Sequence, residues 1–241
     1  MSRRLLLALA LAHGACAKPP PPARPAVAAE LDVPMMILEV AAERSFFLQR
    51  PGEGTAELEA ASREARGVGR TEPLRKLAVA LLWDAEGTPD GRSRSRALAA
   101  ATRAAHEAGG RAGDPRVQAE MAFVELFAAW RLGRPVEQRA ARFVRTQRAS
   151  AETVLYAWLI RGEASLAAER FDQAATAYRW VIGALEHPLY ALALYRTAHS
   201  YFGLGRNSDA RQALREVAAL RGTHAAVRRV EAAARADLAA P

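Results

Sequence analysis

The chain contains two similar units in tandem between Val154 and Leu220, and this repetition constrains the fold more than any other feature of the sequence. Each unit reads as a helix, a short turn and a second helix, with apolar residues at helical spacing. Ala174 and Ala210 hold the same place in the two units and are 36 residues apart. One such hairpin cannot bury its apolar side alone, so neighbouring hairpins must stack. The sequence therefore predicts an all-α fold of stacked helical hairpins.

Side-chain size within the two units also favours close helix packing. Small residues let the two helices of a hairpin approach each other, and large residues fill the gaps between hairpins. The small residues are Gly162, Ala174, Ala198 and Ala210, and the large ones are Trp158, Tyr178 and Tyr201. Gly205 is expected to turn the chain inside the second unit because glycine adopts positive φ at little cost. Pro188 is expected to start the next helix, where its missing N–H costs nothing.

These residues and their spacing resemble the tetratricopeptide repeat (TPR), which has a period of about 34 residues. The matching residues are Trp158, Gly162, Phe171, Ala174, Tyr178 and Pro188 in the first unit, and Ala198, Tyr201, Gly205, Ala210 and Leu214 in the second. Three positions depart from the pattern: Arg161 replaces a leucine, Ser165 a tyrosine and Glu169 the turn glycine. The resemblance implies a right-handed α-solenoid of TPR-like helical hairpins.

The rest of the chain is expected to be helical as well, because alanine, leucine and arginine dominate its composition. Thr71 is expected to cap one helix, Gly109 and Gly110 to close another, and Asp114 with Pro115 to open a third. Predicted helices cover residues 33–50, 55–67, 71–85, 92–108, 115–132, 135–147 and 223–238. The predicted domains are a lipoprotein signal peptide (1–15), a lipid-anchor site with a proline-rich linker (16–32), a divergent N-terminal helical region (33–110), and TPR-like repeats with a C-terminal capping helix (111–241).

The first 15 residues have the parts of a bacterial export signal. Arg3 and Arg4 precede an apolar run over residues 5–12, which is too short to span a bilayer. Cys16 is the only cysteine of the chain, and residues 11–16 resemble a lipobox, although His13 stands where an aliphatic residue is usual. The resemblance implies that Cys16 is acylated and becomes the first residue of the mature chain.

A second interpretation of this region remains open. Residues 15–17 form an A-x-A site, and cleavage after Ala17 would release a soluble periplasmic or secreted protein. The proline run in residues 18–29 favours polyproline II, a semi-rigid spacer of about 3.1 Å per residue. Such a spacer suits a lipid anchor, because it holds a domain away from the membrane. The residue after Cys16 is Ala17, which is not acidic. The usual sorting rule keeps lipoproteins in the inner membrane when an acidic residue follows the cysteine, so it implies the periplasmic face of the outer membrane for this chain.

No set of residues in the sequence points to catalysis or to a bound cofactor or metal. The histidines are His13, His106, His187, His199 and His224. No two of them stand at positions i and i+4 together with a carboxylate, as a metallohydrolase helix requires. A single cysteine excludes an internal disulfide framework. We therefore expect a protein that is not an enzyme, with no cofactor and no small-molecule substrate.

The chain is basic, with a net charge of +8. On a helical wheel, Arg142, Arg145 and Arg148 lie opposite Ala140 and Phe143, which is typical of a solvated helix face. Aromatic residues that would stack on bases are missing there, and an export signal argues against DNA, so no nucleic-acid partner is expected. Electrostatic binding of an anionic polymer or a membrane surface stays open as an alternative function.

A candidate surface for a protein partner follows from the repeat resemblance. In a TPR solenoid the first helix of each hairpin lines the concave surface. By the register above, the residues that point into it are Tyr156, Leu159, Glu163, Tyr195 and His199. Their chemistry suits an extended peptide or a partner helix, although the same residues could serve only for packing.

Exported TPR proteins with a lipid anchor look like the helical lipoproteins of outer-membrane assembly machines and like pilotins. The resemblance implies a non-catalytic adaptor that assembles a cell-envelope complex.

The anchoring hypothesis is tested by replacing Cys16 with serine in the full chain. We expect this change to abolish labelling with a radioactive fatty acid and to move the protein out of the membrane fraction, because two acyl chains give anchoring that one signal cannot. A mature N-terminus at Lys18 in the unchanged protein would contradict acylation and favour the A-x-A site.

Overall fold

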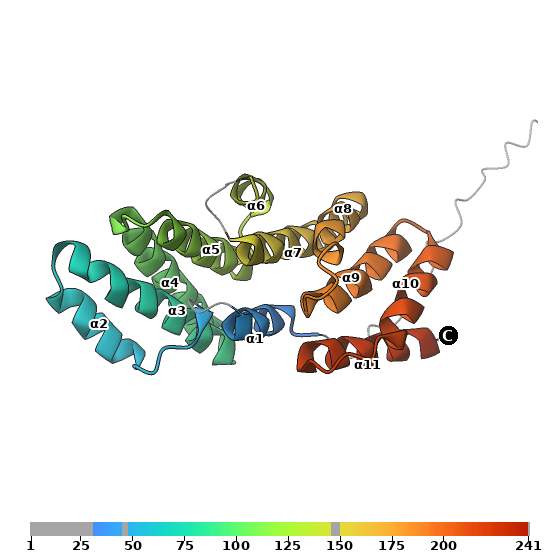
Figure 1. The fold of residues 1–241 in the computed structure, drawn as a ribbon, viewed down its shortest axis with the longest axis horizontal. Coiled ribbons are helices and arrows are strands. Elements are labelled where there is room, and N and C mark those ends of the chain that lie inside the picture. The colour runs from blue at the N-terminus through green and yellow to red at the C-terminus, as the bar shows by residue number, and fades with distance from the viewer. Residues whose placement is uncertain (1–30, 45–47, 146–149, 241) are drawn as a thin grey trace, which may run out of the picture.

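A computed structural model describes residues 31–44, 48–145 and 150–240 of the chain, and this part is all-helical (Figure 1). No strand occurs among these residues, and none of their helices is both long and apolar enough to cross a membrane. The helices are α1 (Val33–Arg44), α2 (Thr55–Glu64), the 3-10 helix η2 (Gly67–Arg70), α3 (Thr71–Gly87), α4 (Gly91–Arg111), α5 (Pro115–Arg131), α6 (Glu137–Phe143), α7 (Ala151–Ala167), α8 (Phe171–Ile182), α9 (Leu189–Gly203), α10 (Asn207–Ala219) and α11 (Ala225–Ala239).

Most helix boundaries follow from local signals, but two expected capping signals are wrong. The helices predicted over 55–67 and 135–147 are also shorter in the structure, at Thr55–Glu64 and Glu137–Phe143. Asp114 caps α5 as expected, since its carboxylate accepts a hydrogen bond from the backbone N–H of Arg116 at 2.8 Å. Thr71 is not a cap, because the turn η2 precedes it and makes it the first residue of α3. The pair Gly109 and Gly110 does not end α4, which continues to Arg111. A β-carbon on Gly109 would lie 3.3 Å from the Cβ of Met121, so packing against α5 outweighs the weak helix propensity of glycine.

The helices pack mainly against their neighbours in the chain. Contacts join α2 to α3, α3 to α4 and α4 to α5, and they continue from α7 through α8, α9 and α10 to α11. Together these helices form an elongated arc, with α2 to α4 at one end and α9 to α11 at the other (Figure 1). The apolar residues form one continuous core that includes residues of α1 and of both ends of the arc.

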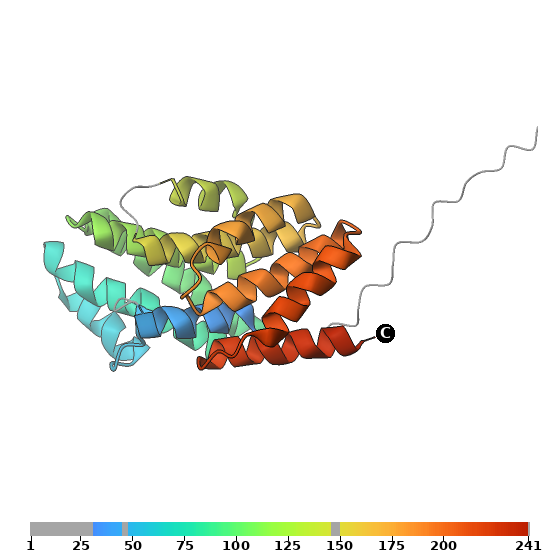
Figure 2. The same cartoon turned by 45° about the vertical axis from the view of Figure 1, so that its right-hand side comes forward.

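Helix α1 departs from this sequential order, because it lies on the inner side of the arc (Figures 1 and 2). It contacts α3, and its side chains form ion pairs with α7 and α11. Six of its residues are at most 2% exposed: Val33, Met36, Ile37, Leu38, Val40 and Ala41. The helix therefore fills interior space between two parts of the chain that are far apart in sequence.

Three turns of the arc repeat the same backbone conformation at intervals of 36 residues. Gly133, Glu169 and Gly205 all have positive φ, of 66°, 57° and 73°. The backbone N–H of the next residue bonds the carbonyl five residues earlier each time, from Arg134 to Ala129, Arg170 to Ser165 and Arg206 to Tyr201. Each turn thus ends a helix with the same left-handed cap. The occurrence at Gly133 lies before the two units that the sequence pattern defines.

Close approach of helices inside a unit also follows the expected pattern. A β-carbon on Gly162 would lie 2.3 Å from the ring of Tyr178, so α7 and α8 could not approach this closely with a larger residue there. Ala174, Ala198 and Ala210 are fully buried. The small residues named from the sequence therefore lie where helices meet.

The repeated turn generates a stability prediction at Glu169, which is the one non-glycine among the three. A left-handed conformation costs an ordinary residue roughly 1–2 kcal/mol, so Glu169→Gly should raise the free energy of unfolding by about 1 kcal/mol relative to Glu169→Ala. Alanine is the matched control, because both changes remove the same carboxylate and only one removes the Cβ. Urea unfolding measures the difference. Equal stability of the two variants would contradict the strained turn.

Candidate functional site

The five residues named for partner binding all lie on α7 and α9, but other parts of the protein cover them. Tyr156, Leu159 and Tyr195 are at most 1% exposed. The side chains of Glu163 and His199 are 11% and 15% exposed. In this structure none of the five offers an open contact surface, because each is enclosed by neighbouring helices. Their role toward a partner stays a prediction, which requires that a covering element move away.

Glu163 belongs to a polar cluster that joins three successive helices. Its Oε1 atom accepts a hydrogen bond from the Tyr178 hydroxyl of α8 at 2.8 Å and lies 3.1 Å from Nε of Arg196 on α9. Burial, together with the nearby Glu163 charge, raises the pKa of Tyr178 well above 10. The tyrosine therefore stays a neutral donor, and Glu163 is occupied inside the protein.

Tyr195 and His199 meet at a second buried carboxylate. The Tyr195 hydroxyl donates to Oδ2 of Asp237 on α11 at 2.8 Å, and Nε2 of His199 lies 3.1 Å from the same oxygen. The two rings are in edge contact, with centroids 4.5 Å apart. Burial, and secondly the charge of Arg196, lowers the pKa of His199. This cluster fixes α11 against α9.

Tyr156 takes part in a third cluster, centred on Glu152, which reaches α1. Glu152 accepts hydrogen bonds from the Tyr156 hydroxyl at 2.8 Å, from Nε of Arg44 at 2.8 Å and from Nε2 of His187 at 2.9 Å. The backbone N–H of Leu189 donates to the other ring nitrogen of His187, so the proton of the neutral ring is on Nε2. Burial alone would raise the pKa of Glu152, but these three hydrogen bonds outweigh it and lower the pKa.

The far side of α1 is held by a second histidine. Nε2 of His224 lies 2.6 Å from Glu43, while its Nδ1 accepts the backbone N–H of Ala226 and so caps α11. Glu39, one turn before Glu43, pairs with Arg229. These pairs show that α1 runs antiparallel to α11. The site built by the structure is therefore an inner groove that already holds a helix.

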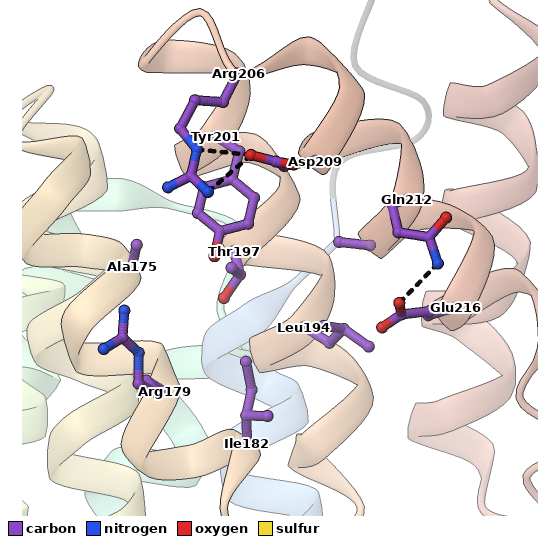
Figure 3. Close-up of a pocket in the computed structure, with 11 residues that line it drawn as sticks. Ala175, Arg179, Ile182, Leu194, Thr197, Tyr201, Arg206, Asp209, Gln212 and Glu216 are labelled. Atoms are coloured by element: carbon purple, nitrogen blue, oxygen red, sulfur yellow. Dashed lines mark hydrogen bonds and ion pairs between the residues drawn. The ribbon is translucent and has the colours of Figure 1, made fainter.

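Open surfaces lie elsewhere on the molecule. A pocket of about 300 Å³ lies between α8, α9 and α10 (Figure 3). Polar side chains at its rim bond to one another: Arg206 donates to Asp209, and Gln212 donates to Glu216. On α7 and α8, Trp158 and Trp180 stack with ring centroids 5.4 Å apart, and Trp180 is 60% exposed. Trp180 lies on the polar side of the amphipathic helix α8, and this placement is the sequence signal for its exposure.

The buried histidines predict how stability depends on pH. Burial lowers the pKa of both His187 and His199 below the ordinary value of 6.5. The unfolded chain therefore binds protons more readily than the folded one as pH falls through 6.5, and stability is lost on the acid side. We expect the urea concentration at the midpoint of unfolding to decrease when the pH is lowered from 7 to 5.5. His199→Gln keeps a donor near Asp237 without a titrating ring and should reduce this dependence.

The control for that measurement is His106→Gln, because the His106 side chain is 83% exposed. The pH dependence should survive this change. A urea midpoint that is constant between pH 7 and pH 5.5 in the unchanged protein would contradict the assignment.

Comparison of this chain with protein-family models, with curated proteins and with solved structures found no match in any of the three.

Proposed function

We propose that this protein is a non-catalytic adaptor of the bacterial cell envelope, which holds a partner protein on the inner surface of an arc of helices. The observation that carries the proposal is α1 itself. The inner surface accommodates a helix, with apolar side chains buried on most sides and charged side chains paired along its edge. Proteins that bind a partner helix in a groove use this combination.

The proposal includes the finer architecture, a right-handed α-solenoid of TPR-like hairpins. Support comes from helices that pack in chain order and from the left-handed turn that recurs every 36 residues. Solenoids of this kind present extended concave surfaces and serve as scaffolds. The proposal also includes a lipid anchor at Cys16 and a place on the periplasmic face of the outer membrane. Both rest on residues 1–30 of the sequence, which lie outside the described residues.

The alternative, an electrostatic binder of anionic polymers, has less support. Arg142 and Arg145 are exposed as the helical wheel predicted, and Arg148 lies outside the described residues. Many arginines are engaged with carboxylates inside the protein, among them Arg75, Arg131, Arg196 and Arg229. Positive charge that pairs internally attracts an external polyanion less. A protein partner is therefore the better supported reading.

Site-specific photo-crosslinking in intact cells tests the function. The probe is placed at Ala232, an exposed residue that lines a shallow groove with Glu39 and Glu43. We expect a protein partner to be captured from Ala232, and not from Gln173, a matched exposed position on α8. In Figure 1, helix α8 lies at the top of the molecule and α11 at the bottom.

Two results would count against this function. One is capture from Gln173 alone, which would place the partner on another face. The other is the absence of any protein crosslink from Ala232, together with binding to an anionic polymer that weakens steeply as salt is added.

A further inference from the structure

Helix α1 is attached to the rest of the protein through its side chains. As for the other described helices, no backbone hydrogen bond joins α1 to another helix. Its side-chain links are the three pairs Arg44 with Glu152, Glu43 with His224 and Glu39 with Arg229. These charged groups are partly exposed, and exposed ion pairs contribute little to stability. Burial of its apolar side chains therefore provides most of its attachment.

The position of α1 in the chain makes its departure feasible. The other helices pair mainly with their sequence neighbours, so those pairings stay intact when α1 leaves. Helix α1 is the first described helix, and only its C-terminal end leads into the arc. Its release would uncover the inner side of the arc beside Glu152 of α7 and beside His224 and Arg229 at α11.

The chemistry of the vacated groove is specific. It combines an apolar lining with two basic groups, Arg229 and His224, along one edge and the carboxylate of Glu152 at one end. A ligand that fits must be a helix with apolar residues around most of its surface. It must also carry two acidic side chains one turn apart, and a cation near its C-terminal end.

We propose that α1 is a displaceable internal ligand, and that a partner protein inserts a helix of this pattern in its place. The inference rests on the proposed function and names the partner's binding element. In the resting chain α1 keeps the groove closed and prevents an apolar surface from being exposed. A partner helix competes with α1 for the same contacts, so its apparent affinity is its intrinsic affinity multiplied by the fraction of chains in which α1 has left the groove.

A labelled synthetic peptide with the sequence of residues 31–48 tests the proposal by fluorescence anisotropy on the full chain. In the variant Glu39→Arg with Glu43→Arg, the internal helix meets Arg229 with like charge, loses the carboxylate that lies beside His224, and is weakened. We expect the peptide to bind this variant at least ten-fold more tightly than the unchanged chain. A control peptide that carries the same two arginines should bind at least ten-fold more weakly than the peptide with glutamates.

The reversal variant must keep its helical circular dichroism. The milder pair Glu39→Gln and Glu43→Gln loosens the same contacts without like charges and serves if the reversal unfolds the chain. Folded variants that bind neither peptide would overturn the proposal. Loss of helical signal in the glutamine variant would also overturn it, because α1 would then be an obligate part of the core. Formation of dimers by native mass spectrometry would identify a second copy as the occupant and overturn the commitment to a different protein.

These outcomes are separate from those of the crosslinking experiment. A partner captured from Ala232 with no peptide binding would leave the adaptor function standing and remove the displacement of α1. Peptide binding without any captured protein in cells would support the displacement of α1 and count against the adaptor function.

Discussion

The interior of the arc is the constraint on which the structure depends. Helices that pack in sequence order bury the sides by which they meet, and an arc of them retains an apolar inner surface that needs a cover. Helix α1 provides that cover with six residues that are at most 2% exposed. It also links regions that sequential packing does not join, since it reaches α3, α7 and α11. Helix α1 and the arc therefore share one apolar core.

Three carboxylates, of which Asp237 is buried and Glu152 and Glu163 are partly buried, add specificity to this core. Glu152, Glu163 and Asp237 each accept a hydrogen bond from a tyrosine hydroxyl and lie beside a basic side chain. A carboxylate taken out of water is costly unless such partners surround it. The three clusters therefore favour one arrangement of α7, α8, α9 and α11. The Glu152 cluster also fixes the C-terminal end of α1, because Arg44 donates a hydrogen bond to Glu152.

The local features of the fold could be predicted from sequence because short-range chemistry determines them. The all-helical class is confirmed, and so are the cap at Asp114 and the turn at Gly205. Even the mismatch at Glu169 was visible, because the sequence places a glutamate where the repeat uses glycine, and the chain still adopts the left-handed turn. These predictions needed only a few neighbouring residues.

The candidate site was harder to predict because it depends on contacts between distant parts of the chain. Tyr195 is covered by Asp237, 42 residues later. The groove is filled by α1, whose Glu39 pairs with Arg229, 190 residues away. A repeat pattern gives the register of a helix face, but it does not show whether another segment lies on that face. The face was therefore assigned as open, while in the structure it is occupied.

Hydrogen exchange of the unchanged protein, followed by mass spectrometry, tests the central role of α1 most directly. If α1 is a separate occupant of the arc, amides of residues 33–44 should exchange through an opening that leaves α3, α4, α5 and α9 protected. Exchange of α1 only together with those helices, at the free energy of global unfolding, would show that α1 is an inseparable part of the core and would contradict this role.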